Sequence, residues 1–368
     1  MTKRLRVGID ARLSVGSYRG MGRYTREFGA QCAEQVYWLG HARQGSDALV
    51  THATGTPLYP VWEQLVLPRL CRELRLDAVL CPYNTGPLAS IGSTRLFLVV
   101  HDLIYLESGQ TVPYGGSPYQ MVGRLYRRLV VPRAVARAHA LVTVSSYTAR
   151  EIERRLRANG KPLLVVPNTI EETWFDVPTS PTPRKDFILT VSGEAPHKNL
   201  YRVIQAFQQA TASGVLPAKM RLLIAGVSPA RFPAVSDLAE RLGVAGSTQL
   251  LPYVSAQEMQ ELYRTAAFMV FPSLIEGFGI PVLEAMASGC PVIVSDRGAL
   301  PEVAGDAALV VDPLSVEAIA DAMGRVWCEP ALAGELANRG RRNAERFHPR
   351  AVHPQMRDAW NTLSSVCA

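Results

Sequence analysis

The chain has 368 residues, which is long enough for two domains that each bury a full hydrophobic core. Hydrophobic residues make up 48% and charged residues 19% of the chain, and this balance excludes a disordered protein. The formal net charge of +7 favours anionic partners such as nucleotide diphosphates, lipid pyrophosphates or an acidic membrane surface.

The six cysteines are scattered without close pairs, so we interpret them as reduced thiols rather than as disulfides or zinc ligands. No recognised nucleic-acid-binding module is present, which makes nucleic acid the weaker anionic partner. The N-terminal segment lacks the apolar core of a signal peptide, and no run approaches the ~18 apolar residues of a membrane span. We therefore expect a cytoplasmic protein.

The first half of the chain alternates short apolar strands with helices, the pattern of an α/β fold with buried parallel strands. A first strand is predicted at 5–9, followed by a loop with Gly16, Gly20 and Gly22 and by a helix over about 23–35. Further strands are predicted at 78–81, 96–100, 141–144 and 163–166. A glycine-bearing turn after the first strand is where such folds bind phosphate, although a lone turn is weak evidence.

His101 and Asp102 follow the strand predicted at 96–100. Ligands in open α/β sheets bind off the carboxyl ends of the strands, so both residues are placed for function. Taken alone, however, a histidine at a strand end is more often a structural residue than a functional one.

Residues 108–150 contain no Asp or Glu. Within them Arg124, Arg127 and Arg128 alternate with Leu125 and Leu129 at helical spacing, which predicts an amphipathic basic helix. Such a helix, interleaved with aromatic residues, suits an anionic lipid surface. The alternative is a basic face that is merely solvated, and the pattern leaves both open.

A segment rich in Pro and Thr, 179–184, is predicted to link the first half to a second α/β alternation that starts with a strand at 187–191. Lys198 follows this strand, close to the start of a helix predicted over about 200–212, where its ammonium can reach a diphosphate. Further strands are predicted at 222–225, 249–251, 268–271 and 291–294.

A glycine-bearing loop and a short helix, predicted over 281–288, follow the strand at 268–271. The position before this helix holds Ile280, which offers no capping oxygen, so the first N–H groups of the helix need another partner. A bound anion would serve, because Gly277 and Gly279 allow close backbone approach.

Glu276 lies on this loop and Glu284 in the predicted first turn of the helix, where carboxylates can accept hydroxyls of a ribose or sugar. Taken alone, they leave two interpretations equally open: this functional one, and one in which Glu284 only complements the helix dipole and Glu276 is a solvated loop residue. In their context, Pro-Ser-Leu-Ile-Glu-Gly-Phe-Gly-Ile-Pro-Val-Leu-Glu-Ala-Met-Ala at 272–287, they resemble the signature of retaining, nucleotide-sugar-dependent glycosyltransferases of family four.

The resemblance covers nearly the whole chain and is densest from 192 to 313. It implies an α/β, GT-B fold, in which two Rossmann-like domains with parallel sheets face each other across a cleft. The expected parts are an acceptor-side domain at 1–170, a nucleotide-sugar-binding domain at 171–346 and a C-terminal helix at 347–368 that crosses back to the first domain.

The resemblance also implies roles for single residues. In the family, a glycine loop similar to Gly20-Met-Gly22 lies beside the donor phosphate, the histidine of a His-Asp pair contacts the transferred sugar, and a lysine like Lys198 binds the pyrophosphate. The expected catalytic residues are His101, Asp102 and Glu276, and the expected donor-binding residues are Gly20, Gly22, Lys198, Tyr253, Gly277, Phe278, Gly279 and Glu284. Many relatives carry an Arg just before the lysine; here Glu194 and His197 occupy the neighbourhood, and Arg202 is a candidate substitute.

The implied reaction moves a hexose from a nucleotide diphosphate sugar to a glycan or polyprenyl-linked acceptor, with retention at the anomeric carbon and without a metal or cofactor. Gly-Ile-Asp-Ala-Arg, His-Asp-Leu and Pro-His-Lys-Asn-Leu together are most similar to bacterial mannosyltransferases of polysaccharide and lipopolysaccharide assembly, so GDP-mannose is the expected donor. The alternatives are a nucleotide-sugar 2-epimerase of the same fold and a catalytically silent nucleotide-sugar-binding or membrane-surface protein. The expected location is the cytoplasm, with peripheral attachment to the inner face of the membrane.

Overall fold

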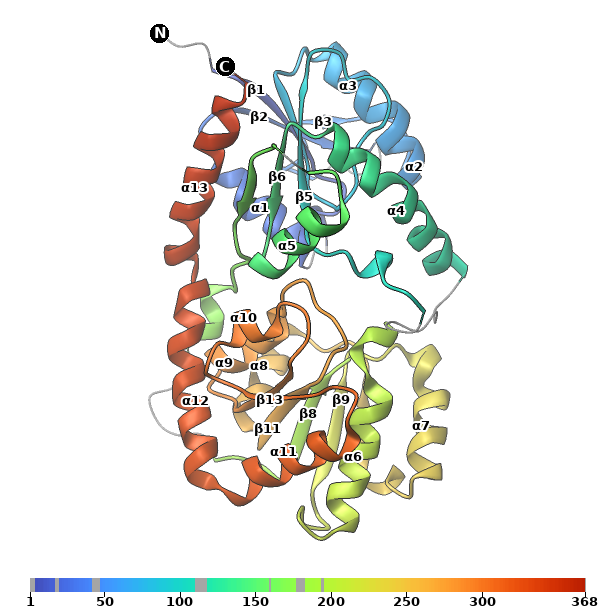
Figure 1. Cartoon of the computed structure of the whole chain (residues 1–368), viewed down its shortest axis with the longest axis vertical. Coiled ribbons are helices and arrows are strands. Elements are labelled where there is room, and N and C mark those ends of the chain that lie inside the picture. The colour runs from blue at the N-terminus through green and yellow to red at the C-terminus, as the bar shows by residue number, and fades with distance from the viewer. Residues whose placement is uncertain are drawn as a thin grey trace. The chain divides into compact units, whose positions relative to one another are not determined.

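The computed structural model describes residues 4–16, 20–41, 47–109, 118–158, 160–176, 183–192 and 195–367, without the side chains of 118–120. The chain folds into two compact units (Figure 1). Unit 1 consists of Met1–Leu106, Val122–Thr169 and Arg350–Ala368, and unit 2 of Glu107–Met121 and Ile170–Pro349. Glu194 and most of the linker predicted at 179–184 lie outside the described residues.

Unit 1 is built on a seven-stranded parallel sheet with the strand order β3-β2-β1-β4-β5-β6-β7. The strands are β1 (Arg6–Asp10), β2 (Gln35–Gly40), β3 (His52–Ala53), β4 (Ala78–Cys81), β5 (Arg95–Val100), β6 (Ala140–Thr143) and β7 (Leu163–Val165). Strands β4 and β6 are buried along their whole length, as expected for a parallel sheet with helices on both faces. The strand order reverses between β1 and β4.

The helices of unit 1 are α1 (Met21–Ala30), α2 (Tyr59–Val61), the π-helical turn η2 (Trp62–Val66), α3 (Leu67–Glu73), α4 (Pro118–Arg137), α5 (Ser146–Arg155) and α13 (Pro349–Ser365), with the 3₁₀ turn η3 (Ile104–Leu106). Helix α13 packs on α1, because the ring of Trp360 stacks on Phe28 at 4.9 Å and its Nε1 donates to the Phe28 carbonyl at 2.6 Å. The C-terminal segment therefore completes the core of the first unit.

The helix predicted over 23–35 is wrong at both ends, because α1 begins at Met21 and ends at Ala30. Gln35 is already the first residue of β2, a strand that is not among those predicted. Residues 36–39 of β2, Val-Tyr-Trp-Leu, are an apolar run typical of a strand, and the strand is missed because the helix is predicted to extend as far as Gln35.

Unit 2 is built on a six-stranded parallel sheet with the order β10-β9-β8-β11-β12-β13. The strands are β8 (Phe187–Val191), β9 (Arg221–Ala225), β10 (Thr248–Leu251), β11 (Phe268–Phe271), β12 (Val292–Ser295) and β13 (Leu309–Val311). The helices are α6 (Leu200–Ala212), α7 (Phe232–Arg241), α8 (Ala256–Thr265), α9 (Ile280–Ala287), α10 (Leu300–Ala304), α11 (Val316–Cys328) and α12 (Pro330–Ala344). The strand order reverses between the paired central strands β8 and β11.

Candidate functional site

Two loops of unit 2 leave the carboxyl ends of β8 and β11, the neighbouring strands at which the order of the sheet reverses. The first loop carries His197 and Lys198 in a 3₁₀ turn, η5 (Pro196–Lys198), and the second carries Glu276. In open α/β sheets this switch point is where ligands bind. The topology alone therefore makes these loops the candidate site of the unit.

Lys198 and Glu276 form an ion pair between the two loops. The Nζ atom of Lys198 lies 2.7 Å from Oε1 of Glu276 and 4.6 Å from the ring centroid of Phe271. Nε2 of His197 lies 4.0 Å from the same carboxylate oxygen. The site therefore holds fixed charges of both signs.

Glu276 is buried, with 9% of its surface exposed. Burial on its own would raise the pKa of this carboxyl, but the charge of Lys198, and after it that of His197, outweighs burial and holds the pKa below its ordinary value. Glu276 is accordingly ionised at neutral pH. A charged carboxylate in a largely desolvated position interacts more strongly with a nearby developing charge than it would in water.

Asn199 fastens the loops of this site to one another. Its backbone is left-handed, with φ 60°, and its Nδ2 donates to the carbonyls of Pro272 at 2.9 Å and Pro313 at 2.7 Å. The N–H of Leu274 donates in turn to the carbonyl of His197 at 2.7 Å. Asn199 is not among the residues predicted from the sequence, although an Asn next to a predicted helix start is a signal for the left-handed region, which Asn tolerates.

A third loop fixes the backbone of Glu276. The N–H of Ala299 donates to the Glu276 carbonyl at 2.9 Å. Gly298 has φ +66°, and a Cβ atom there would lie 2.6 Å from both N and O of Glu276. Only glycine permits this approach, so the turn between β12 and α10 sets the position of Glu276. Gly298 is likewise not among the residues predicted from the sequence.

Helix α9 begins at Ile280, one residue earlier than predicted, and Gly279 occupies the N-cap position. The expectation of a missing cap is confirmed, since Gly279 has φ 122° and no side-chain oxygen bonds the first turn. The earlier start corrects the position of Glu284, which is the fifth residue of the helix and lies beyond its first turn. Glu284 is half-buried.

Glu284 is placed against Tyr263 of α8. Burial, and after it the Glu284 carboxylate, raises the pKa of Tyr263 well above its ordinary value. Tyr253, another expected donor-binding residue, follows β10 at the edge of the sheet and is 65% exposed. The structure thus brings Lys198, Glu276 and the loop with Gly277 and Gly279 together. Tyr253 lies further out, beyond β9.

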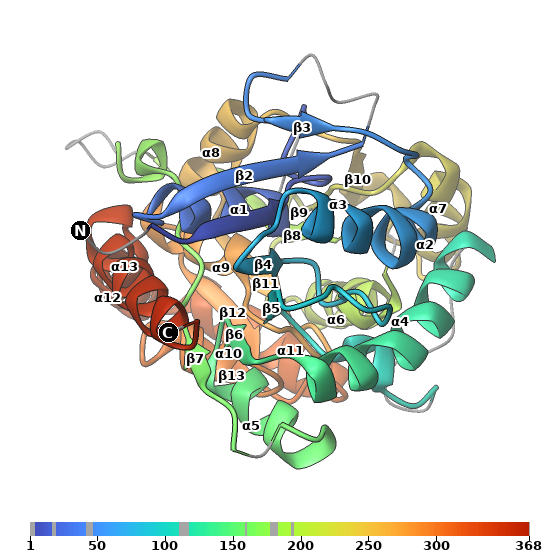
Figure 2. The same cartoon turned by 90° about the horizontal axis from the view of Figure 1, so that it is seen from above.

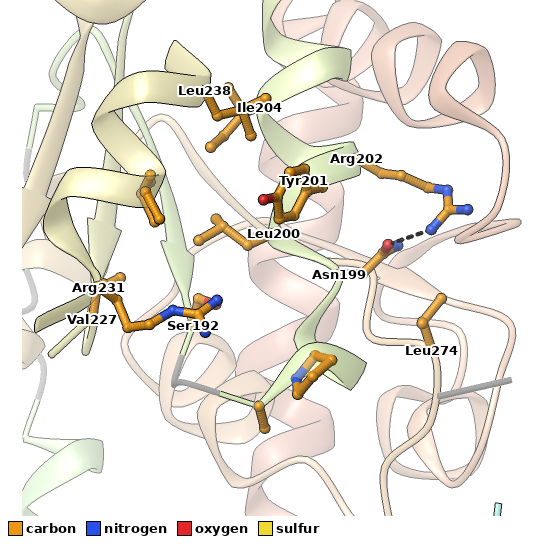
Figure 3. Close-up of a pocket in the computed structure, with 14 residues that line it drawn as sticks. Ser192, Asn199, Leu200, Tyr201, Arg202, Ile204, Val227, Arg231, Leu238 and Leu274 are labelled. Carbon is orange, nitrogen blue, oxygen red and sulfur yellow. Dashed lines mark hydrogen bonds between the residues drawn. The ribbon is translucent and has the colours of Figure 1, made fainter. Parts of the chain in front are cut away.

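A cavity of about 380 Å³ lies beside the Lys198 loop, between α6 and α7 (Figure 3). Much of its lining is aliphatic, and its polar lining includes Ser192, Asn199, Tyr201, Arg202 and Arg231. Arg202 is held to Asn199, with its NH1 donating to Oδ1 at 3.0 Å, and Figure 3 shows it directed away from Arg231. The cavity has the size and mixed lining of a small-ligand pocket.

His101 lies in unit 1, just past the end of β5, and is 7% exposed. Its Nε2 donates to the carbonyl of Pro82 at 2.9 Å, its N–H donates to Oδ1 of Asn84 at 2.6 Å, and its ring meets the ring of Tyr24 edge-on. Burial lowers its pKa to about 4, and the hydrogen bond to the Pro82 carbonyl, which raises the pKa, offsets this only in part. The side chain is thus neutral at pH 7, with its proton on Nε2.

The other expected residues of unit 1 lie at the starts of short helices. Oδ1 of Asp102 accepts from the N–H of Ile104 at 3.1 Å, which caps the turn η3. Gly20 precedes α1 with φ 42°, and nothing lies within 4 Å of where its Cβ would be. Gly22 is buried in the first turn of α1 rather than in the preceding loop, contrary to expectation.

The state of His101 predicts how acid affects stability. An unfolded histidine takes up a proton near pH 6.5, whereas the folded one does so only near pH 4, so stability is full above about 6.5 and is lost as the pH falls toward 4. The difference amounts to about 3 kcal/mol of unfolding free energy. Denaturant titrations from pH 7 to 4 should show this loss in the parent and a loss smaller by about that amount in His101→Gln. Equal losses in both proteins would contradict the assignment.

Two family models match the chain: Glycosyltransferase Family 4 over residues 18–174 and Glycosyl transferases group 1 over residues 172–347. The structure of Anabaena Alr3699/HepE in complex with UDP and glucose superposes with a TM-score of 0.71 at 17% identity, covering 98% of this chain and 100% of that chain. The chain therefore belongs to the family-four glycosyltransferases, and its two Rossmann-like units are those of the GT-B fold.

Within this family the chain resembles bacterial mannosyltransferases. It is 36% identical over 160 residues to O-antigen chain mannosyltransferase B of Escherichia coli, covering 41% of this chain and 40% of that protein. It is 28% identical over 231 residues to O-antigen chain mannosyltransferase RfbU of Salmonella typhimurium, covering 61% and 63%. The matched segments span less than two thirds of either relative. Among the described residues, no helix has the length and apolar character that crossing a membrane requires.

Proposed function

We propose that the protein transfers a hexose, with mannose from GDP-mannose as the first candidate, to a glycan or polyprenyl-linked acceptor with retention and without a metal. The observation that carries the proposal is the Lys198–Glu276 pair at the switch point of unit 2, beside the N-terminus of α9, which has no side-chain cap. The mannosyltransferase names of the relatives support the choice of sugar.

The leaving group of such a transfer is a nucleoside diphosphate, which must be stabilised as negative charge builds on it. In the proposal Lys198 and the N–H groups around Phe278 and Gly279 supply that stabilisation as preorganised charges and dipoles. The Lys198 ammonium already contacts the Glu276 carboxylate and the ring of Phe271. Its side chain is therefore largely ordered, and little further conformational entropy is lost when the diphosphate binds. The diphosphate then shares Lys198 with Glu276.

The sugar ring gains positive charge as the diphosphate leaves, and in the proposal the buried Glu276 carboxylate stabilises that charge. His101 is neutral and can only exchange hydrogen bonds with a sugar hydroxyl, and Asp102 lies beside it. We assign no carboxylate as a nucleophile, so attack from the face of the departing diphosphate accounts for retention. Glu284, Tyr253, Gly20 and Gly22 complete the proposed donor site.

In the proposal the two halves of the chain bind different substrates. Residues 171–346 bind the nucleotide of the donor, residues 1–170 form the acceptor side, and residues 347–368 form the C-terminal helix. A lipid-linked acceptor would place the protein at an anionic membrane surface as a peripheral protein, and its net charge of +7 suits such a surface.

Lys198→Ala should weaken nucleoside diphosphate binding about tenfold or more, because a charge-assisted hydrogen bond contributes about 1.5–3 kcal/mol. Calorimetric titration with GDP and UDP measures the change. Lys219→Ala is the matched control, since Lys219 is an exposed lysine of unit 2 that pairs only with Asp186 among the contacts described. Unchanged diphosphate affinity in Lys198→Ala would remove Lys198 from the donor site.

The activity is tested by thermal stabilisation with a panel of nucleotide sugars, followed by a turnover assay with the stabilising donor and a polyprenyl-linked acceptor. The expected result is stabilisation by GDP-mannose and an α-linked product. Binding without turnover would point to a silent binding protein, and conversion of the free nucleotide sugar to its 2-epimer would point to an epimerase.

A further inference from the structure

Two helical segments of unit 1 expose apolar side chains at identical spacing. The first stripe, Leu58, Val61 and Leu65, starts just before α2 and runs into the turn η2, and the second stripe, Val122, Leu125 and Leu129, lies on α4. Both follow the pattern i, i+3, i+7, which places three residues on one face of a helix. Their exposed fractions range from 37% to 67%, unusually high for a set of aliphatic side chains.

Around its apolar stripe, helix α4 has the opposite orientation to a helix with a solvated basic face: the arginines there are half-buried and the leucines are exposed. Arg124 and Arg128 are half-buried and donate to the backbone carbonyls of Tyr105 and Leu106, at 3.3 and 3.4 Å. Leu125 and Leu129 point outward instead, with 60% and 52% of their surfaces exposed. The arginines fix the orientation of the helix, and the leucines face the surroundings.

Tyr126 holds the two stripe-bearing segments together. Its hydroxyl donates to Oε1 of Glu63 at 2.8 Å and accepts from Nε2 of Gln64 at 2.9 Å, and its ring meets that of Tyr59 edge-on. Glu63 is fully buried and is paired at 3.0 Å with Arg12. Figures 1 and 2 show α2 and α4 on the same side of unit 1. The two segments are thus joined to each other on one side of unit 1, rather than being two independent helices.

The charges around the stripes select the partner. Exposed arginines continue both faces toward the C-terminal ends of the helices, Arg69 and Arg72 after the first stripe and Arg133 and Arg137 after the second. Helix α4 contains no Asp or Glu, and the segment 59–73 contains only the buried Glu63 and Glu73, which pairs with Arg69. Apart from the Arg69–Glu73 pair, the exposed charges of the two segments are positive, so a second copy of this surface would be repelled as a whole and a negatively charged partner attracted.

We propose that this surface docks onto an anionic lipid bilayer, with the stripes Leu58/Val61/Leu65 and Val122/Leu125/Leu129 entering the headgroup and acyl boundary. The exposed arginines then lie at the level of the lipid phosphates. Membrane attachment is part of the proposed function, but the docking surface stands on unit 1 alone and does not depend on which sugar or donor is used.

Co-sedimentation of the full chain with phosphatidylglycerol–phosphatidylethanolamine vesicles tests the proposal. The double variants Leu125→Ser/Leu129→Ser and Leu58→Ser/Leu65→Ser should each bind about tenfold more weakly or worse, because each removes two inserted aliphatic side chains. The matched control Val165→Ser/Val310→Ser removes exposed valines, 41% and 44% accessible, from the edge strands β7 and β13 and should bind as the parent does.

The contribution of the arginines is tested by Arg133→Gln/Arg137→Gln, which should also bind the vesicles more weakly. Phosphatidylcholine vesicles and added salt should each weaken vesicle binding of the parent. Nucleoside diphosphate affinity should be unchanged in every variant, which separates failure of the docking surface from failure of the donor site. Parent-like vesicle binding by both leucine variants would overturn the proposal. So would a dimeric parent whose leucine variants are monomeric, since a second copy would then cover the surface.

Discussion

Glu276→Gln is expected to lower kcat by on the order of a hundredfold or more, the scale of removing one preorganised electrostatic group. Glutamine keeps the shape of the side chain and loses its charge, so only stabilisation that depends on the charge disappears. Because positive charge develops on the sugar ring in the transition state, the loss should appear in kcat. Steady-state kinetics with a saturating donor measures it.

The pairing of Glu276 with Lys198 sharpens this expectation. The neutral side chain no longer competes with the diphosphate for the Lys198 ammonium, so nucleoside diphosphate affinity should be unchanged or somewhat higher. The substitution leaves the Lys198 ammonium without its carboxylate partner, and a bound diphosphate supplies the missing negative charge. A loss of kcat that came instead from misfolding would lower diphosphate affinity as well, and calorimetry distinguishes the two.

Glu284→Gln provides the contrast. In the proposed donor site Glu284 contacts the ribose, whose contacts are similar in ground state and transition state, so its loss should mainly raise the KM for donor. Glu240→Gln, on the exposed face of α7, is the neutral control. The reverse pattern, in which Glu276→Gln loses nucleotide affinity and Glu284→Gln loses kcat alone, would mean that the donor lies in the opposite direction.

The parallel sheets could be predicted from the sequence wherever burial is complete. Strands β4 and β11 are continuous apolar runs, because both faces of each strand are covered by other elements. Strand β2 has an apolar run at residues 36–39 and was missed because the preceding helix was predicted to extend to Gln35, five residues past its end. The segment 59–73 carries apolar residues on its outer as well as its inner face, which hides the helical periodicity, so it was missed as well.

The candidate site was predictable as separate parts but not as an arrangement. Lys198 and Glu276 each stood out by their position after a strand, whereas their ion pair joins residues 78 positions apart. Their contact depends on β8 and β11 being neighbours, which is a property of the strand order. Asn199 and Gly298 act through backbone geometry, which leaves little trace in the sequence.

Gly298→Ala is expected to lower kcat on the order of a hundredfold, although Gly298 has no side chain to offer a substrate. A methyl group there would lie 2.6 Å from N and O of Glu276, and backbone atoms cannot move aside as a flexible side chain can. Glu276 must therefore shift, and a displacement of about 1 Å from the reacting centre can cost that much in rate. We expect kcat to fall with nucleoside diphosphate affinity nearly retained, as in Glu276→Gln.

The control separates displacement of Glu276 from backbone strain. Gly243 also has a left-handed backbone, with φ +70°, but nothing lies within 4 Å of its Cβ position. Gly243→Ala should therefore cost about 1–2 kcal/mol of stability, as should the strain component of Gly298→Ala, without any change in kcat. If Gly298→Ala retains the parent's kcat while Gly243→Ala shows the expected loss of stability, the turn between β12 and α10 does not set the position of Glu276.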